Sequence, residues 1–444
     1  MNQTLTVELP FTLRIERMIP GGKGLAFYQG RAVFIPHVVP GDLVLVREFW
    51  DRGSYLQALN IEILEPSPDR MPPPCPFFGD CGGCDFQQMT YSRQLQSKQE
   101  ILLDALRRIG KINLSPDRVT VIPSPPLNYR NRIQLKMTPK PLPPAWGFYT
   151  AGSHRVCEIN DCLLVTKSLW EAARWMIELL HKVPEVQGEL DEMEVLEGDD
   201  HQYLGNLILK GRPQRYDFIA EALKQQLEKS PAGQGWTISL TSPSGGYDCV
   251  WGNGYIWKTV GEFLYRVSHG TFFQINETLL PKLQERVLQG CSGRRALDLF
   301  CGVGFFTLPL SRCFESVEAV EVNPGATLDL KANLKKNRVT NCQALNVDLT
   351  DFLRRGLSSP HLELDLLLTD PPRTGLPPRT VQRIAELKVR RLIYVSCDPS
   401  TLARDLAVLV NANYEIVSLE LLDLFPQTHH LEGVVRLERN SKKD

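Results

Sequence analysis

The 444-residue chain is long enough for two to four domains, and 43% hydrophobic residues allow more than one buried core. No stretch reaches the roughly 18 apolar residues that cross a membrane, and no secretion signal is evident, so we expect a cytoplasmic protein without a membrane partner. A formal net charge of −1 excludes a protein that coats nucleic acid through a general basic excess. Any contact with nucleic acid must be local.

Residues 1–65 are predicted to form a small closed β-barrel. Short strand-like runs alternate with Gly and Pro-Gly turns, a pattern typical of such barrels. The predicted strands are residues 5–18, 24–29, 31–36, 42–50 and 55–64. The proline-rich run PSPDRMPPPCP at 66–76 ends this domain, because proline donates no hydrogen bond to a sheet.

Residues 66–265 are predicted to form a central α+β domain. Its first element is an amphipathic helix at 92–110, which ends at Gly110 and could pack on the C-terminal domain. Over 120–265, strand-like runs alternate with two helical segments, near 166–182 and 213–228. This pattern indicates a mixed, largely antiparallel module.

Eleven cysteines, an odd number, favour a reducing compartment over a disulfide framework. Cys75, Cys81 and Cys84 follow the spacing C-x5-C-x2-C, which suits metal ligation. Cys162 is the candidate fourth ligand, and Cys157 is a less favoured competitor. The spacing alone leaves zinc and an iron–sulfur cluster open.

A basic segment runs over residues 101–140, where eight Lys and Arg face two Asp. We interpret it as a candidate phosphate-binding stripe, with Arg130, Arg132 and Lys136 as the contacts. A solvated surface is the competing interpretation, because charge runs usually have no ligand.

Residues 266–444 are predicted to form a Rossmann-like, doubly wound domain, because strand-like and helical runs alternate. The seven predicted strands are residues 295–300, 316–322, 342–347, 364–370, 390–397, 415–424 and 432–439.

The first of these strands leads into LDLFCGVGFFTLPL, in which Gly302 and Gly304 let a ligand approach the backbone. Glu321 follows Gly302 by nineteen positions, where a carboxylate can accept ribose hydroxyls. A nucleoside-containing cofactor is therefore expected. A nicotinamide dinucleotide is the competing interpretation, but the third glycine of G-x-G-x-x-G is missing.

Catalytic residues are expected at the ends of the later strands. Asp370 ends the fourth strand and Cys397 the fifth, so both should face one crevice at the carboxyl edge of the sheet. Glu432 begins the last strand. A thiol and carboxylates in one crevice suit covalent catalysis with a general base.

Three motifs, DPPRTGL (370–376), YVSCDPSTLARDL (394–406) and HHLEGVV (429–435), resemble the RNA (uracil-5-)methyltransferase family, and FFQIN (272–276) contributes its glutamine. The resemblance spans essentially the whole chain and implies S-adenosylmethionine as the methyl donor. The implied cofactor-binding residues are Gln274, Phe300, Gly302, Gly304, Phe305, Glu321, Asp348 and Asp370, although family members often have Asn where this chain has Phe305.

The resemblance also implies the roles of the catalytic residues. Cys397 would add to carbon 6 of a uracil so that carbon 5 becomes nucleophilic. Glu432 would then remove the proton from carbon 5, with Asp370 as the third catalytic residue.

The segment GGKGLAFYQGRAVFIPHVVPGDLVLV (21–46) resembles a TRAM domain, an RNA-binding relative of the oligonucleotide-binding barrel. TRAM domain and cysteines together resemble the family members that modify 23S ribosomal RNA, in which these cysteines hold a [4Fe–4S] cluster. We expect a monomer that binds 23S rRNA.

Four alternatives remain open. They are a tRNA substrate, a noncatalytic iron–sulfur RNA-binding assembly factor, a radical methylthio-transferring enzyme and a small-molecule or protein methyltransferase. The radical enzymes use C-x3-C-x2-C, which this chain lacks. A small-molecule or protein substrate would leave the barrel and the basic stripe unexplained.

Overall fold

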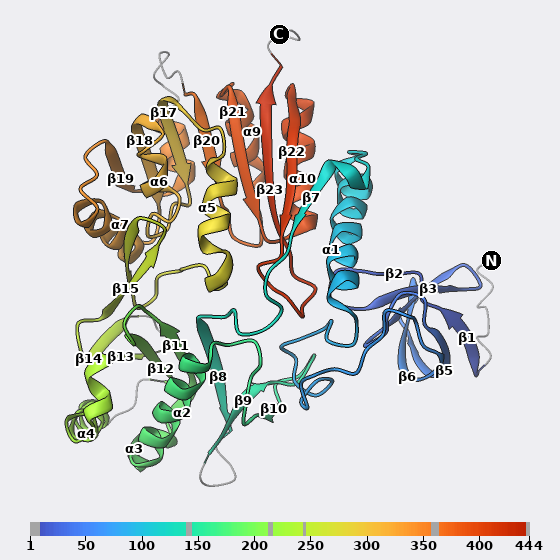
Figure 1. Ribbon diagram of the computed structural model, residues 1–444, viewed down its shortest axis with the longest axis horizontal. Coiled ribbons are helices and arrows are strands. Elements are labelled where there is room, and N and C mark those ends of the chain that lie inside the picture. The colour runs from blue at the N-terminus through green and yellow to red at the C-terminus, as the bar shows by residue number, and fades with distance from the viewer. Residues whose placement is uncertain (1–8, 139–143, 212–215, 243–245, 357–363, 441–444) are drawn as a thin grey trace.

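The structure is a computed structural model that describes residues 9–138, 144–211, 216–242, 246–356 and 364–440. Three β-sheets and a separate two-stranded hairpin form the framework of this part of the chain. In Figure 1 the C-terminal sheet and its helices lie above the central sheet, and the N-terminal sheet lies to one side, next to helix α1. No helix among these residues is long and apolar enough to span a membrane.

The N-terminal sheet has six strands in the order β1-β5-β6-β4-β3-β2 and curls into a half-barrel. Only Ile15 and Glu16 separate β1 from β2, yet these short strands lie at opposite edges and do not pair in the described structure. The prediction of a closed barrel is therefore wrong, although the predicted strands are present from residue 9 onward. Their bounds are β1 (Phe11–Arg14), β2 (Arg17–Met18), β3 (Gly24–Tyr28), β4 (Arg31–Ile35), β5 (Leu43–Asp51) and β6 (Tyr55–Glu65).

Helix α1 (Tyr91–Ala105) continues as a π-helical turn, Leu106–Gly110, which confirms the predicted helix. The chain leaves this turn at Lys111, which has a φ of +56°. α1 and its π turn pack against α10 of the C-terminal part. The fully buried Lys98 ammonium donates to Asp423 Oδ1 at 2.5 Å and to the Phe425 carbonyl at 2.9 Å. α1 is thus anchored to the segment that leads into the last strand.

The central sheet has seven strands in the order β10-β9-β8-β11-β12-β13-β14, all antiparallel except the pair β12–β13. Its apolar core includes buried residues of α2 and α4, which confirms the predicted mixed module. The first residues of the second predicted helix, 213–215, lie outside the described residues. The bounds are β8 (Arg132–Thr138), β9 (Ala145–Tyr149), β10 (Val156–Glu158), α2 (Lys167–His181), α3 (Pro184–Gln187), β11 (Leu190–Glu197), β12 (Tyr203–Leu209), α4 (Tyr216–Glu228), β13 (Trp236–Thr241) and β14 (Tyr247–Trp251).

The C-terminal sheet has eight strands in the order β19-β18-β17-β20-β21-β23-β22-β7. All seven predicted strands are present, and only β23 runs antiparallel to its neighbours. The eighth strand, β7 (Val119–Ile122), comes from far earlier in the chain and pairs parallel to β22. The other strands are β17 (Gly293–Leu299), β18 (Phe314–Glu321), β19 (Cys342–Asn346), β20 (Leu366–Thr369), β21 (Arg391–Ser396), β22 (Tyr414–Leu422) and β23 (Glu432–Arg439).

Helices and apolar side chains cover both faces of this sheet. Alternate residues of β20 contribute to two separate apolar clusters, as expected for a strand buried on both faces. Asn323 and Asp398 cap α7 and α10 by accepting backbone N–H groups of the first turn. The helices are α5 (Leu280–Leu288), α6 (Thr307–Leu310), α7 (Pro324–Lys336), α8 (Leu349–Gly356), α9 (Pro378–Glu386) and α10 (Pro399–Asn411).

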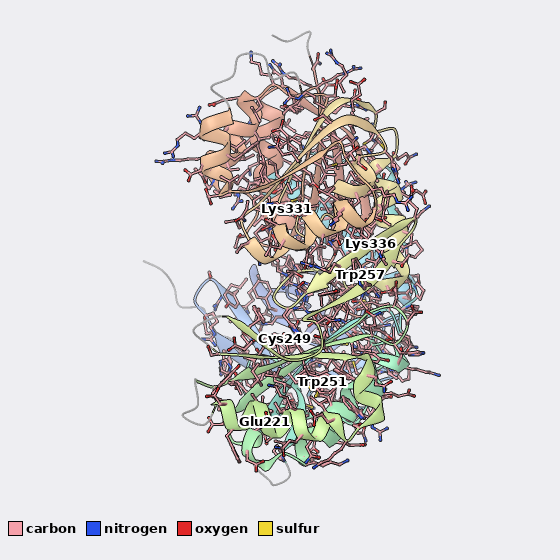
Figure 2. All side chains as sticks on the ribbon, turned by 90° about the vertical axis from the view of Figure 1, so that its left-hand side faces the viewer. Glu221, Cys249, Trp251, Trp257, Lys331 and Lys336 are labelled. Atoms are coloured by element: carbon pink, nitrogen blue, oxygen red, sulfur yellow. The ribbon has the colours of Figure 1, made fainter. Side chains whose placement is uncertain are left out.

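A hairpin of β15 (Tyr255–Val260) and β16 (Phe263–Ser268) joins the central and C-terminal parts. Arg266 of β16 forms an ion pair with the buried Asp329 of α7, with 2.6 Å between Nε and Oδ1. The Lys336 ammonium lies over the Trp257 ring at 5.4 Å from its centroid, and Figure 2 shows both residues where the two parts meet. The hairpin therefore holds the C-terminal sheet against the central part.

Candidate active site

Pairing in the C-terminal sheet brings the predicted catalytic residues to one edge. β17, β20 and β21 are parallel neighbours, so Phe300, Asp370 and Cys397 follow strands that end side by side. β23 runs the other way, and Gly433 pairs with Ser396. Glu432 and Cys397 are the residues next to that pair, which places the carboxyl group and the thiol together at the carboxyl edge.

The loop after β17 is shaped for close approach of a ligand. Phe300, Gly302 and Gly304 all have positive φ, at +59°, +54° and +94°. At Gly304 the positive φ strains any residue that has a side chain, and an added Cβ would also lie 2.5 Å from the end of the Leu330 side chain, which would have to move. A Cβ at Gly302 would meet no atom within 4 Å, so space opens in front of that backbone. The loop fits a cofactor that lies against the Gly302 backbone.

Glu321, at the end of β18, lies beside this loop. One carboxylate oxygen accepts the Gly302 N–H at 3.0 Å, and the other accepts the Asn323 N–H at 2.7 Å. These bonds fix the carboxylate at the carboxyl edge, where it can accept hydroxyls of a nucleoside. Gly302 and Glu321 therefore lie together in the structure, as their spacing in the sequence predicted.

Of the three remaining predicted cofactor residues, Gln274 lies at the catalytic edge, Asp348 caps a helix, and the Phe305 side chain belongs to the core. The buried Gln274 donates from Nε2 to Asp370 Oδ2 at 3.4 Å, so the glutamine of FFQIN lies at the catalytic edge. Asp348 caps α8, with Oδ1 accepting the Thr350 N–H at 2.8 Å. The Phe305 ring is buried among Tyr265, Phe273 and Phe306, so the Phe305 side chain is a core residue.

Asp298 is a buried residue that the sequence analysis did not single out. Burial raises the pKa of Asp298 to about 7. Its Oδ2 accepts the Thr307 hydroxyl at 2.6 Å, while Oδ1 has no partner in the described structure. Asp298 thus ties the end of β17 to the start of α6 across the glycine loop. An acidic residue inside the apolar strand LDLF is the feature of the sequence that could have identified Asp298.

Three ionisable groups at the catalytic edge, Asp370, Glu432 and Cys397, have raised pKa values. Burial raises the pKa of Asp370 to about 7, and burial together with the charge of Asp370 raises the pKa of Glu432 well above its ordinary value. The negative charge of Asp370 therefore favours a proton on Glu432. Burial, and then the negative charge of Glu432, raises the pKa of the half-buried Cys397 to about 12. At rest Cys397 is a thiol.

Arg373, in DPPRTG, opposes these shifts and was missed as a site residue. Its positive charge lowers the pKa of both Cys397 and Glu432. A cation at this place favours the thiolate. Arg373 could have been identified from the sequence, because it lies three residues after Asp370 in a polar loop.

The four predicted metal-ligating cysteines are brought together from distant segments. Cys75, Cys81, Cys84 and Cys162 interact electrostatically, and burial raises the pKa of Cys81 to about 11 and of Cys84 to about 12. Cys157 also interacts with Cys81, but the Cys157 side chain is buried against the central sheet. Within the described residues, no three His, Cys, Asp or Glu side chains are spaced to hold a metal ion.

The cysteine loop is connected to the catalytic edge. Asp85, next to Cys84, accepts from His429 Nδ1 at 2.6 Å, three residues before Glu432. The backbone N–H groups of Asp85 and Phe86 both donate to the Gln427 carbonyl at 3.0 Å. The two predicted sites therefore share one packed segment, residues 423–430.

The predicted basic residues line a cavity of about 410 Å³ next to the cysteine loop, with Gly82 and Gly83 on its wall. Two of the three are paired with acidic residues of β11, since Arg132 contacts Glu194 and Lys136 contacts Glu192. Lys140 lies outside the described residues. The stripe is thus less positive than its sequence predicts.

Comparison with known proteins identifies the family. The model of the tRNA (uracil-5-)-methyltransferase family matches residues 90–440. The chain belongs to this family. It is accordingly an RNA (uracil-5-)methyltransferase, and S-adenosylmethionine is its methyl donor.

The relatives match over nearly the full length. An uncharacterized RNA methyltransferase of Aquifex aeolicus is 32% identical, covering 97% of this chain and 98% of the relative. The 23S rRNA (uracil(1939)-C(5))-methyltransferase RlmD of Shewanella amazonensis is 30% identical, covering 98% and 97%. The structure is similar to that of Pyrococcus abyssi tRNA (uracil-54, C5)-methyltransferase in complex with S-adenosyl-L-homocysteine, with a TM-score of 0.72, 25% identity and coverage of 96% and 99%.

Proposed function

We propose that this enzyme methylates carbon 5 of a uridine in 23S rRNA, with Cys397 as the nucleophile and Glu432 as the general base. The observation that carries the assignment of roles is the pairing of Ser396 with Gly433, which places both side chains at one edge beside Asp370. Such proximity of a thiol and carboxyl groups is what covalent addition followed by proton removal requires.

The proposed reaction follows from this arrangement. The Cys397 thiolate adds to carbon 6 of the uracil, and the electron pair moves into an enolate whose carbon 5 attacks a methyl group. S-adenosylmethionine would supply that methyl group in electrophilic form, and its sulfur would keep the electron pair of the broken S–CH3 bond as S-adenosyl-L-homocysteine leaves. The Glu432 carboxylate takes the proton from carbon 5, and the electron pair of that C–H bond expels the Cys397 thiolate from carbon 6.

The reaction also needs a change in protonation after the substrates bind. In the resting enzyme Cys397 is a thiol with a pKa near 12, and the pKa of Asp370 is raised to about 7. Arg373 is the cation whose charge favours the Cys397 thiolate. Gln274 holds Asp370 in place. We assign Arg373 the role of stabilising the thiolate.

Binding of S-adenosylmethionine is assigned to Gly302, Glu321, Gln274 and Asp370, whose geometry at the carboxyl edge fits a nucleoside-bearing ligand. Phe300 and Gly304 shape the loop. Asp348 would contribute through the N-terminus of α8. Phe305 would support the loop from the core, since its carbonyl accepts the Tyr265 hydroxyl at 3.1 Å.

The N-terminal half-barrel is proposed to be a TRAM domain, and residues 66–265 and 266–444 to be the central and catalytic domains. The four cysteines have the chemistry of a [4Fe–4S] site, because four thiols from two segments meet in one half-buried place. Cys75, Cys81, Cys84 and Cys162 would hold the cluster, which would order the wall of the cavity lined by Arg130. Bound iron would keep these thiols deprotonated.

Metal analysis tests the cluster. Protein purified without oxygen should contain about four iron atoms per chain. Cys162→Ala should lose most of that iron, whereas Cys157→Ala should keep it. One zinc per chain without iron would contradict the proposal.

The choice of 23S rRNA over tRNA rests on the relatives, because the rRNA enzyme is more similar in sequence than the tRNA enzyme. Methyl transfer to 23S rRNA and to tRNA, both from cells without 5-methyluridine, tests this choice. Incorporation into tRNA alone would overturn it.

A stalled intermediate tests the two catalytic roles. Glu432→Gln should still form the adduct and accept the methyl group, but without a base the adduct cannot collapse. A protein–RNA complex that survives denaturing electrophoresis and contains label from the methyl group is expected. The double variant Glu432→Gln/Cys397→Ala should form none. Absence of the complex in the single variant, or its persistence in the double, would refute the roles.

A further inference from the structure

The DPPRTGL loop, which carries Arg373, is held by side chains from the first two turns of α10. The Thr401 hydroxyl donates to the Arg373 carbonyl at 3.2 Å. The Arg404 guanidinium donates to two further carbonyls of the loop, that of Thr374 at 3.2 Å and that of Leu376 at 2.8 Å. Three carbonyls of this loop therefore accept hydrogen bonds from one helix.

Asp405 connects the same loop to the core of the C-terminal part. Oδ2 of this buried carboxylate accepts the Leu376 N–H at 2.9 Å and the Tyr394 hydroxyl at 2.7 Å. Oδ1 accepts from Arg404 Nε at 2.8 Å. Tyr394 is buried in β21, the strand that ends just before Cys397. The Asp405 carboxylate thus ties the loop to both the strand and the helix that flank the proposed nucleophile.

The loop and the helix are in close contact at Gly375. This residue has a φ of +70°, and a Cβ added to it would lie 2.6 Å from Arg404 Nη2 and 2.8 Å from Thr401 Cβ. Glycine is therefore the residue that lets the loop approach the helix. We call the three side chains that hold the loop, those of Thr401, Arg404 and Asp405, the α10 clamp.

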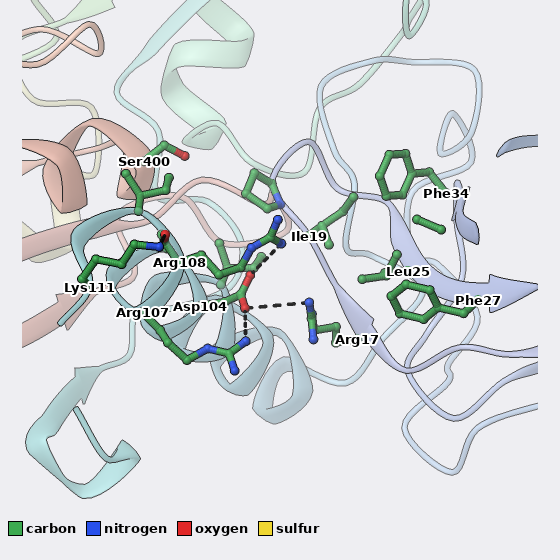
Figure 3. Close-up of a pocket in the computed structure, with 15 residues that line it drawn as sticks. Arg17, Ile19, Leu25, Phe27, Phe34, Asp104, Arg107, Arg108, Lys111 and Ser400 are labelled. Carbon is green, nitrogen blue, oxygen red and sulfur yellow. Dashed lines mark hydrogen bonds and ion pairs between the residues drawn. The ribbon is translucent and has the colours of Figure 1, made fainter. Parts of the chain in front are cut away.

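α10 is itself supported by the π turn that follows α1. Figure 3 shows Ser400, in the first turn of α10, beside this π turn. Gly110 of the π turn lies so close to α10 that an added Cβ would be 2.9 Å from the Ala403 carbonyl. The α10 clamp therefore projects from a helix that is packed in place, as precise positioning of a functional group requires.

We propose that the α10 clamp positions Arg373 for the chemistry at Cys397. The inference rests on the proposed function, in which the charge of Arg373 favours the thiolate, and extends it to residues that do not touch the reacting atoms. Glu432 and Asp370 also act on the thiol, and both charges disfavour the thiolate. Because Arg373 lies in a loop, its ability to oppose them depends on the contacts that fix this loop.

Alkylation of Cys397 by iodoacetamide tests the proposal on the full chain purified without oxygen, because the thiolate is the reactive form. Mass spectrometry of peptides separates Cys397 from the other cysteines. Arg373→Ala should slow the alkylation at constant pH by about tenfold, since an opposite charge nearby typically changes a pKa by about 1 or more. Arg404→Ala should slow it to a similar extent. The exposed Cys249 is the internal control, and its rate should be the same in every variant.

The double variant Arg373→Ala/Arg404→Ala separates positioning from a general loosening of the fold. If Arg404 acts through Arg373, Cys397 in the double variant should react no more slowly than in Arg373→Ala alone. Losses that multiply to about a hundredfold would show that Arg404 acts by another route, and would overturn the inference. A rate in Arg404→Ala equal to that of the unaltered chain would overturn it as well.

Gly375→Ala tests the same contact from the side of the loop. The added Cβ would push against Arg404 and Thr401, so alkylation of Cys397 should slow as it does in Arg404→Ala. An unchanged rate would contradict the proposal. Arg354→Ala is the matched control for the loss of an arginine, because this exposed side chain forms its ion pair on α8, and the variant should react like the unaltered chain.

Methyl transfer to RNA distinguishes failure of this inference from failure of the proposed function. Arg404→Ala should lower kcat by about tenfold and leave the KM for S-adenosylmethionine unchanged, because the clamp lies on the side of the thiol. Methyl transfer that persists in Cys397→Ala would overturn the proposed function. If Cys397→Ala is inactive while Arg404→Ala and Gly375→Ala have the alkylation rate and the kcat of the unaltered enzyme, the inference about the α10 clamp alone is overturned.

Discussion

The catalytic edge and the cysteine loop are assembled in different ways. At the catalytic edge, Asp370, Cys397 and Glu432 follow or begin strands of one sheet, so backbone pairing sets their positions. In the cysteine loop, Cys75–Cys84 and Cys162 lie in irregular segments whose hydrogen bonds are mostly local turns. The thiols meet but are not at ligand spacing. Sheet pairing alone can preorganise a site, whereas a loop site needs its ligand to complete the geometry.

Replacement of one cysteine from each region should give very different losses. Cys397→Ala removes the nucleophile and should lower turnover by a factor on the order of 10⁴ or more while RNA still binds. Cys84→Ala should lose the cluster and weaken RNA binding but retain turnover at saturating RNA. Steady-state methyl transfer measures both. Equal losses of turnover would show that the cysteine loop takes part in the chemistry, contrary to the comparison.

The raised pKa of the buried Asp298 should make the stability of the protein depend on pH. Its folded pKa, about 7, lies above the value in the unfolded chain, so the folded state binds the proton more tightly. The free energy of unfolding should therefore fall by about 3 kcal/mol as the pH rises from 4 to 7. Asp298→Asn should remove this part of the pH dependence in urea titrations. An unchanged pH profile in the variant would mean that Asp298 is not responsible.

The smallest expected effect concerns the basic cavity beside the cysteine loop. Glu192→Gln and Glu194→Gln free Lys136 and Arg132 from their ion pairs. RNA affinity should rise severalfold and its salt dependence should steepen, whereas Arg130→Gln/Arg132→Gln/Lys136→Gln should weaken both. Glu285→Gln/Glu386→Gln, at exposed ion pairs elsewhere, is the control. Affinities that do not differ among these variants would place RNA away from this cavity.

The sequence predicted which residues lie at the carboxyl edge of the sheet, because the signals for their positions are local. Apolar strands followed by Gly302, Asp370 and Cys397 can be recognised within a few residues, and parallel strands must end at one edge. Glu432 was found by its motif. The pKa of Asp298 could not be predicted, because it depends on burial by residues from several strands.

Features that depend on contacts between residues far apart in the sequence were either not predicted or predicted incorrectly. The half-barrel stays open because β1 pairs with β5 and β2 with β3, and not with each other, which turn residues do not reveal. β11 was not predicted, so its Glu192 and Glu194 could not be expected opposite Lys136 and Arg132. β7 is only four residues long and has its partner about 300 positions later.

α1 and β7 contact segments that come much later in the chain, and this affects folding during synthesis. Lys98 donates to Asp423 and to the Phe425 carbonyl, and Val119–Ile122 pair only with Leu419–Leu422 among the described residues. The ribosome makes these partners more than 290 residues later, which at about 5–20 residues per second leaves α1 and β7 waiting for roughly 15 to 60 seconds. During that interval an unpaired strand and the apolar face of a helix stay open to chaperones and to other nascent chains.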